Sequence, residues 1–300
     1  EAKARREVIL AGGAINSPQL LMLSGIGDAS HLKNVGIETL VDAKAVGRNL
    51  QDHIAVSYFY KVRTATLNDV LHPFLGKLRA GLRYIADRAG PLSLSVNQSG
   101  GFVRSDATKA HPNLQLYFSP VSYTKTPLSE RKLLNPDPFS AFLLSHNPCR
   151  PTSRGHIELT SSDPSQYPAI HPNYLATQSD IDDVLAGNRI LREIASTKPL
   201  ADIITEELIP GAHVDGDEAL LADFRARADT VYHPTSTCMM GTDPVSSVVD
   251  ARLRVHGIEG LRVVDASVFP TITSGNTNAP TVMVAEKGAA MILEDAKSTR

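Results

Sequence analysis

The sequence is poor in the residues that crosslink small secreted proteins or hold metal ions in clusters. It has no tryptophan and only two cysteines, Cys149 and Cys238, among 300 residues. Two cysteines allow at most one disulfide bond and exclude a cysteine-rich metal framework. Such a low cysteine content is typical of a reducing compartment, and we expect a cytoplasmic location.

An excess of charge of one sign is lacking as well. The chain has 30 Lys and Arg against 32 Asp and Glu, a formal net charge of -2, so no overall field attracts nucleic acid or an anionic membrane. The longest apolar stretch near the C-terminus, residues 281–293, is interrupted by Glu286 and Lys287 and is shorter than the roughly 20 apolar residues of a membrane-spanning helix. We therefore expect no nucleic-acid partner and no transmembrane segment.

Several common catalytic motifs are also missing. The sequence has no P-loop, no Gly-x-Ser-x-Gly nucleophile elbow and no His-Glu-x-x-His pair. Residues 25–30 match only the first part of a dinucleotide fingerprint, and they follow a predicted helix instead of a strand. The sequence thus predicts no nucleotide P-loop and no metal site, and an α/β-hydrolase has little support.

Short apolar runs near both ends predict an α/β domain. Residues 7–11 and 261–265 are typical of strands buried on both faces of a parallel sheet. A helix is expected to begin at Ser17-Pro18, with Ser17 as its N-cap. We expect residues 1–53 and 231–300 to pack together as parts of one domain.

The middle of the chain has a different texture, typical of an α+β arrangement. Residues 54–62, 114–118 and 140–144 have β-branched and aromatic residues at strand density. Residues 74–88 place apolar and basic side chains on opposite faces of a helix, which we expect to cover a sheet. Residues 54–230 are therefore predicted to form a separate sheet-and-helix domain.

Two polar segments in the C-terminal part could carry chemistry. In residues 232–241, His233 follows Tyr232 and is restricted to extended backbone angles by the next residue, Pro234. In residues 274–280, Asn276 lies in a polar turn at the start of an apolar helix, where free N–H groups and the helix dipole favour negative charge. A histidine base and an asparagine donor suit removal of a proton from an alcohol. These residues alone leave open a buried structural histidine and an asparagine helix cap.

Residues 13–27 resemble the second signature of the glucose-methanol-choline (GMC) oxidoreductases. Residues 46–53, 153–164, 233–237 and 264–278 resemble further segments of that family, in the family's order. The family's G-x-G-x-x-G loop, its acidic ribose-binding residue and its first signature have no counterpart in these 300 residues. The chain therefore resembles the C-terminal half to three-fifths of such an enzyme.

The resemblance implies an FAD enzyme that oxidises an alcohol to a carbonyl compound. It implies a partial Rossmann-type FAD-binding domain in residues 1–53 and 231–300 and a substrate-binding domain in residues 54–230. By the resemblance, His233 is the base and Asn276 its partner, which also lies close to the cofactor. The helix start at Thr277 is expected to face the flavin ring.

The remaining residues expected at the site are assigned from the same resemblance. Asp265 and Ala266 match a strand end near the ribityl and pyrophosphate part of FAD, although a turn-capping role for Asp265 remains equally open. Gln98 lies where choline-acting members tend to carry Glu, so a cationic substrate would lack one partner. Tyr232 beside the base would provide an aromatic wall for the substrate. We expect Asn49 and the helix at Ser17 to be scaffold near the cofactor.

Some alternatives stay open at this stage. A non-catalytic binding or interaction module derived from the same fold, without cofactor, is the second hypothesis. The electron acceptor of an enzyme could be oxygen or a quinone-type molecule, and the alcohol itself is not defined by these motifs.

Overall fold

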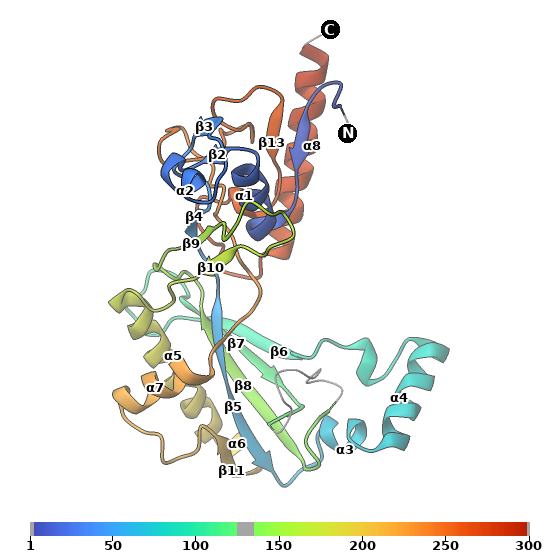
Figure 1. Ribbon diagram of the computed structural model, residues 1–300. Coiled ribbons are helices and arrows are strands. Elements are labelled where there is room, and N and C mark those ends of the chain that lie inside the picture. Colours follow the sequence, from blue (N-terminus) through green and yellow to red (C-terminus); the bar gives the residue numbers. More distant parts are fainter. Residues whose placement is uncertain (1–2, 125–134, 299–300) are drawn as a thin grey trace. The chain divides into compact units, whose positions relative to one another are not determined.

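The computed structural model describes residues 3–124 and 135–298, which fall into two compact units (Figure 1). The first unit combines residues 1–53, 150–180 and 230–300, and the second combines residues 54–149 and 181–229. Both units contain helices and strands, so the expected α/β class is confirmed. The helices and strands, in chain order, are β1 (Val8–Leu10), α1 (Gly13–Leu23), β2 (Ile26–Gly27), α2 (Ala29–Asn34), β3 (Val41–Asp42), β4 (Arg48–Leu50), β5 (Ile54–Val62), α3 (Leu67–Leu71), α4 (Phe74–Asp87), η1 (Pro91–Ser93), β6 (Ser99–Val103), β7 (Leu114–Ser119), β8 (Ala141–Pro148), β9 (Gly155–Glu158), β10 (Ala169–His171), α5 (Gln178–Ser196), α6 (Lys198–Ala201), β11 (Ile204–Ile209), α7 (Asp217–Arg227), β12 (Asp229–Thr230), β13 (Leu261–Val263), η3 (Ala266–Val268) and α8 (Asn278–Ser298).

Strand β1 pairs with β13 in parallel, which joins segments more than 250 residues apart. Val8 and Ile9 of β1 are 47% and 45% exposed, so the expectation that this strand is buried on both faces is wrong. Among the residues that the structure describes, β13 is the only strand beside β1, and the elements packed on the two faces of β1 leave these two side chains nearly half exposed.

Helix α1 begins at Gly13, five residues before Pro18, the expected first residue of the helix. A proline inside a helix leaves the carbonyl four residues earlier without its usual donor. Here the Thr237 hydroxyl donates to that carbonyl, on Ala14, at 2.6 Å. Ser17 does not cap the helix, because its hydroxyl donates to the buried Asp265 carboxylate at 2.6 Å.

A three-stranded sheet of order β10-β9-β4 fixes residues 150–180 in the first unit. Strand β9 pairs with β4, and the Ile157 N–H donates to the Gly47 carbonyl at 2.7 Å. Ile157 is buried in the hydrophobic core of this unit. The sequence analysis placed residues 150–180 in the middle domain, whereas the structure groups them with the first unit. The reason is the pairing of β9 with β4, which the sequence of this turn-rich segment does not specify.

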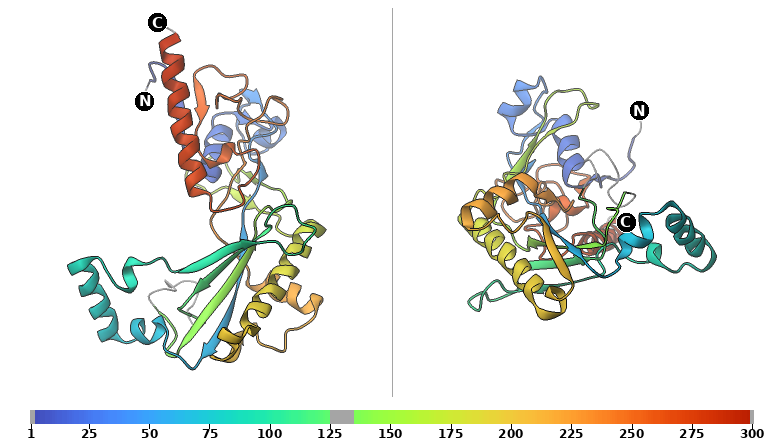
Figure 2. Two further views of the ribbon diagram at one scale, coloured as in Figure 1. Left: turned by 180° about the vertical axis from the view of Figure 1, so that it is seen from behind. Right: turned by 90° about the horizontal axis from the view of Figure 1, so that it is seen from below.

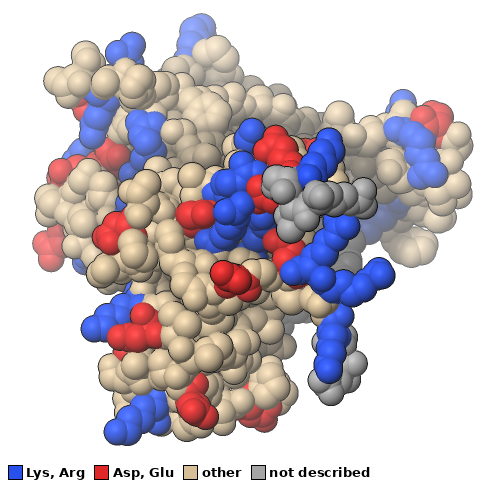
Figure 3. All heavy atoms as spheres, turned by 90° about the horizontal axis from the view of Figure 1, so that it is seen from above, with Lys and Arg blue, Asp and Glu red and all other residues tan. Residues whose placement is uncertain are grey.

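An arginine cluster fastens helix α8 to the rest of the first unit. The guanidinium groups of Arg252, Arg254 and Arg262 all contact the Asp295 carboxylate, and Arg262 also contacts Glu7 at 2.7 Å. Hydrogen bonds from Arg254 and Arg262 hold the pKa of Asp295 well below its usual range. Basic and acidic side chains are intermixed over much of the face seen in Figure 3, as expected of a chain with little net charge.

The second unit is built on an antiparallel sheet of order β11-β5-β8-β7-β6, with β12 also paired to β5. Helices α5 and α7 pack against this sheet (Figure 2). From α7, Arg227 donates to the Ser57 carbonyl at 2.8 Å, and Asn188 on α5 contacts the buried His146 on β8 at 2.9 Å. Burial lowers the pKa of His146 to about 4, so its imidazole is neutral at pH 7.

Helix α4 forms as predicted, but its apolar side chains do not cover a sheet. Phe74, Leu75, Leu78, Leu82 and Ile85 are 49–77% exposed, whereas Ala80 on the other side is buried. The helix therefore packs through its small residues: a side chain at Gly76 would meet the Val70 carbonyl of α3 at 1.9 Å. Among the described residues, no helix is both long enough and apolar enough to cross a membrane.

Candidate active site

His233 is held in place through its backbone by a buried carboxylate. Its N–H donates to Asp52 Oδ1 at 2.8 Å, and Asp52 Oδ2 accepts hydrogen bonds from the hydroxyls of Tyr174, at 2.5 Å, and Thr230. The preceding Tyr232 has φ of 61°, an unfavourable angle for a bulky residue, and its N–H donates to Thr230 Oγ1 at 2.9 Å. The Asp52 network thus fixes the direction in which His233 leaves the chain.

Both ring nitrogens of His233 have partners. Its Nε2 lies 3.1 Å from Nδ2 of Asn276, and its Nδ1 lies 3.0 Å from Nδ1 of His53. The two imidazole rings meet edge to face, with centroids 5.2 Å apart and an interplanar angle of 87°. His233 is 8% exposed and His53 is fully buried.

One arrangement of protons that agrees with these contacts takes the Asn276 amide nitrogen as the donor. With the Asn276 amide nitrogen as donor, His233 Nε2 is an acceptor and carries no proton. The His233 proton is then on Nδ1 and is donated to Nδ1 of His53. The lone pair on Nε2 therefore points toward the amide of Asn276, where a substrate hydroxyl could be bound by both groups.

Burial lowers the pKa of His233, although the nearby Asp52 carboxylate partly opposes this shift. A lower pKa keeps the imidazole neutral at pH 7. A neutral imidazole with an unprotonated Nε2 can accept a proton, so the electrostatics of the site agree with the role of a general base.

Asn276 lies two residues before helix α8. Asn276 is exposed, whereas the following Thr277 is only 7% exposed. The Thr277 carbonyl accepts a hydrogen bond from the Thr281 N–H at 3.0 Å. Helix α8 has 21 residues and begins at Asn278. Its first turn contains no acidic side chain. The positive end of the helix dipole is therefore available to an anion beside His233.

The structure gives Asp265 internal partners. Its Oδ2 accepts from the Gly13 N–H at 2.9 Å and from Ser17, and its Oδ1 accepts from the Ser267 N–H at 2.8 Å as the cap of η3. The Ala266 carbonyl accepts from Ser236 N–H at 3.2 Å. These contacts favour the turn-capping interpretation for the Asp265 carboxylate, and contact with a cofactor through the backbone of residues 265–266 stays a prediction.

The other predicted residues are placed as follows. The Tyr232 side chain is 78% exposed in the first unit, one residue before His233. Asn49 accepts from Arg154 Nε at 2.9 Å, a contact that joins β4 to the segment before β9 and agrees with a scaffold role. Gln98 is exposed and lies just before β6 in the second unit, so its role in substrate binding stays a prediction.

Sequence reasoning missed four residues that support His233: Asp52, His53, Tyr174 and Thr230. Asp52 and His53 stand next to each other at a predicted domain boundary, and adjacent ionisable residues at such a place are a weak signal. No spacing along the chain could have paired them with residues about 180 positions later. Their connection to His233 follows only from the folded chain.

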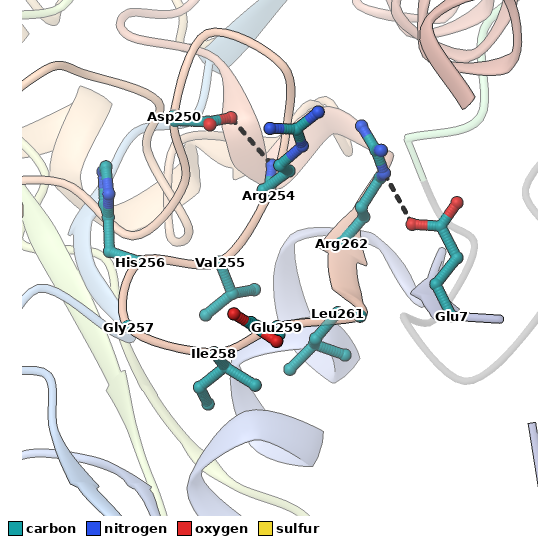
Figure 4. A pocket seen from close by; sticks show the side chains of 11 residues that line it. Glu7, Asp250, Arg254, Val255, His256, Gly257, Ile258, Glu259, Leu261 and Arg262 are labelled. Carbon is teal, nitrogen blue, oxygen red and sulfur yellow. Dashed lines mark hydrogen bonds and ion pairs between the residues drawn. The ribbon is translucent and has the colours of Figure 1, made fainter. Parts of the chain in front are cut away.

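A hollow of about 600 Å³ lies elsewhere in the first unit, around the turn before β13 (Figure 4). Its lining includes charged residues that are already paired, such as Arg262 with Glu7 at 2.7 Å and Arg254, whose guanidinium contacts Asp295. His233 and Asn276 do not line it. This hollow therefore adds nothing to the candidate site.

Two family models of GMC oxidoreductases match the chain, one over residues 1–55 and the other over residues 151–285. The chain belongs to this family, and the resemblance seen in the sequence is confirmed. The chain is 43% identical to human mitochondrial choline dehydrogenase over 298 residues, which are 97% of this chain and 48% of the human protein. It is also 43% identical to an alcohol dehydrogenase (acceptor) of Pseudomonas putida, covering 96% of this chain and 51% of that protein.

Solved structures agree with this assignment. A formate oxidase from Aspergillus oryzae matches 99% of this chain with a TM-score of 0.89 and 30% identity, and the match covers 56% of the oxidase. A fungal aryl-alcohol oxidase matches 97% of the chain with a TM-score of 0.81 and 26% identity, over 55% of its own length. The chain thus spans about half the length of the curated relatives and solved structures that it resembles.

Proposed function

We propose that the full-length protein uses FAD to oxidise the CH–OH group of an alcohol to an aldehyde or ketone. The observation that carries this proposal is the position of His233 Nε2, on a side chain that is 8% exposed, 3.1 Å from the Asn276 amide nitrogen just before a long helix. Relatives named choline dehydrogenase, alcohol dehydrogenase and aryl-alcohol oxidase support the same chemistry.

The residues around α8 fit the ring of a flavin. The start of this helix offers backbone N–H groups and a positive dipole end without an acidic side chain, which suits a ring that becomes anionic on reduction. Bound FAD would supply the acceptor for the hydride that leaves the alcohol carbon. The formate oxidase that this chain resembles has been studied for modification of its FAD. We expect Asn276 and Thr277 to lie near the ring.

The chain's own residues would handle the proton and the oxygen of the substrate. His233 Nε2 would accept the hydroxyl proton, and the Asn276 amide would donate a hydrogen bond to the resulting alkoxide. Asp52 would hold the His233 backbone. His53 Nδ1 would accept a hydrogen bond from the protonated Nδ1 of His233, which would keep the imidazole in the required tautomer.

We infer that neutral or aromatic primary alcohols are preferred over choline. Gln98 provides no carboxylate for a cationic substrate, and a desolvated cation without a partner is costly. The exposed ring of Tyr232 suits an apolar or benzylic group, although a ring face also attracts cations. The electron acceptor is proposed to be oxygen or a quinone-type molecule.

We also propose a reducing compartment, the cytoplasm, as the location of the protein. The support is that Cys149 and Cys238 are buried thiols that form no disulfide bond with each other. The human relative is named mitochondrial, so fractionation of the source cells would decide between these compartments.

Anaerobic stopped-flow spectroscopy on the full-length protein tests the proposed reaction. We expect bound yellow flavin that is bleached by benzyl alcohol and aliphatic primary alcohols, with a higher kcat/KM for these than for choline. A protein that binds no flavin would support the second hypothesis, a non-catalytic module. No observation among the described residues favours that hypothesis. A kcat/KM for choline above that for the neutral alcohols would overturn the substrate preference alone.

The chain of 300 residues provides a further test. It contains no G-x-G-x-x-G loop, the element that binds the pyrophosphate of dinucleotides in folds of this type. We expect these residues, expressed alone, to retain FAD poorly. Stoichiometric flavin in the purified 300-residue protein would contradict this expectation.

A further inference from the structure

Three potential metal ligands lie on one face of the β9–β10 pair, which shares no residue with the His233 site. His156 and Glu158 are two positions apart on β9, so their side chains point to the same face of the sheet. His171 on β10 is the cross-strand partner of His156. Two imidazoles and one carboxylate are therefore placed side by side by strand register.

The donor atoms of these side chains have spacings suited to a single ion. Glu158 Oε1 lies 3.4 Å from His171 Nε2, and Glu158 Oε2 lies 3.7 Å from His156 Nε2. One ligand atom from each residue lies within 4.8 Å of the others. Metal–ligand bonds of about 2.0–2.1 Å in a tetrahedron separate the ligand atoms by roughly 3.3 Å, so ligand atoms that lie within 4.8 Å of one another must move somewhat closer to hold one ion.

We propose that His156, Glu158 and His171 bind one divalent transition-metal ion of the zinc type, with one coordination position left for water. Two imidazoles and a carboxylate are ligands that zinc and its neighbours in the first transition row accept. The three side chains are 32%, 36% and 48% exposed, so an ion can reach them from solvent. The proposal is independent of the proposed alcohol oxidation.

The backbone beneath the cluster is closely packed, which limits movement of the ligands. A side chain at Gly155 would meet the His171 carbonyl at 2.0 Å, so only glycine allows the strands to approach there. The small Ala169 lies opposite Glu158 and leaves room for the carboxylate. On the other face, Ile157 is buried in the core and anchors β9. The site is therefore mounted on a fixed element and not on a loose loop.

The charges around the cluster allow a cation but set a limit on its affinity. Arg48 on β4 lies opposite His156 and opposes a positive ion. The Glu158 carboxylate provides the compensating negative charge between the two imidazoles. Nearby His31 accepts from the Leu159 N–H at 3.1 Å through Nε2 and is oriented toward the backbone by this contact.

The stacked rings show how little rearrangement is needed. The His156 and His171 rings lie 4.5 Å apart, with an interplanar angle of 18°. Rotation of the rings about their side-chain bonds would aim both Nε2 atoms at one point beside Glu158. A bound ion would then fasten β10 to β9 three residues before Tyr174, which donates to Asp52. We therefore expect an effect of the ion on stability.

The test uses the full-length protein without an affinity tag, after a chelator has removed bound metal. This protein is titrated with Zn²⁺ in competition with a chromophoric chelator. Matched single variants are His156→Gln, Glu158→Gln and His171→Gln, and the control is His111→Gln, an exposed histidine in the second unit. Circular dichroism checks that each variant is folded. Thermal unfolding with and without Zn²⁺ provides a second measurement, and Co²⁺ absorption reports on the ligands.

We expect one Zn²⁺ per chain, bound equally by the wild type and His111→Gln. Loss of even an outer partner of a metal ligand weakens binding about 10- to 100-fold, so each ligand variant should lose at least about tenfold in affinity. In these ligand variants, Zn²⁺ should no longer raise the Tm. Absence of saturable binding in the wild type, or unchanged binding in a folded His171→Gln variant, would overturn the proposal.

Discussion

The first unit contains two pairs of histidines in contact, and they differ in every property that controls what a histidine does. His53 and His233 meet edge to face in a buried site, and each directs Nδ1 at the other. His156 and His171 stack with a carboxylate beside both Nε2 atoms and remain partly exposed. The first arrangement suits the proposed base, because its ring nitrogens are buried and have partners. The second leaves two ring nitrogens and a carboxylate accessible to solvent, as the proposed metal site requires. Burial and partners, and not residue type, distinguish the two proposed roles.

The largest effect is expected from loss of the His233 imidazole. Replacement of His233 by Ala should lower the rate of flavin reduction by alcohol about 10²- to 10⁴-fold, because a positioned base contributes this much. Anaerobic stopped-flow measurements at saturating alcohol provide the rate, and the flavin spectrum shows whether FAD is retained. The exposed control His111→Gln should react like the wild type. An unchanged rate in His233→Ala would leave His233 as a structural histidine and remove the contrast.

Asn276 should have the next largest effect. Asn276→Ala removes a hydrogen-bond donor 3.1 Å from the base and should cost up to about 10²- to 10³-fold in flavin reduction, as expected of a donor to a developing oxyanion. The fold should persist, since the residue is exposed. We would abandon the oxyanion role if this variant raised KM but left the limiting reduction rate unaltered.

Asp52 tests the positioning of the buried pair. Asp52→Asn keeps the shape but loses one acceptor oxygen among the contacts to His233, Tyr174 and Thr230, so we expect a loss of about 1–3 kcal/mol in the free energy of unfolding. The carboxylate raises the pKa of His233, so its loss should move the acidic limb of the kcat/KM profile to lower pH. Tyr174→Phe, which retains the charge, is the matched control and should leave that limb nearly in place.

The smallest effect concerns the pH dependence of the wild type. Burial lowers the pKa of His233 below its ordinary value of about 6.5. A base must be neutral, so activity is lost as pH falls through this lowered pKa, and the acidic limb should lie below about pH 6.5. A kcat/KM profile whose acidic limb lies above that value would show that the buried pair does not keep His233 neutral.

The local sequence predicts where some helices form, but it does not predict which neighbours those helices contact. Residues 74–87 form a helix as their pattern predicts, because the spacing of apolar side chains acts within a few residues. The face that α4 buries was predicted wrongly, since an amphipathic pattern gives two faces but does not say which neighbour exists. The start of α1 was misplaced because a distant hydroxyl, on Thr237, satisfies the carbonyl that Pro18 leaves without a donor.

The sequence by itself determined the family, the α/β class and the two residues expected to act on the substrate, His233 and Asn276. Motifs of this kind can be found along the chain because each is a short run with its own backbone requirement. Only the tertiary structure brought Asp52 and His53 to His233, and His156 to His171. Such contacts depend on strand register and on packing between segments that are far apart in the sequence. No single segment of the chain determines either of these.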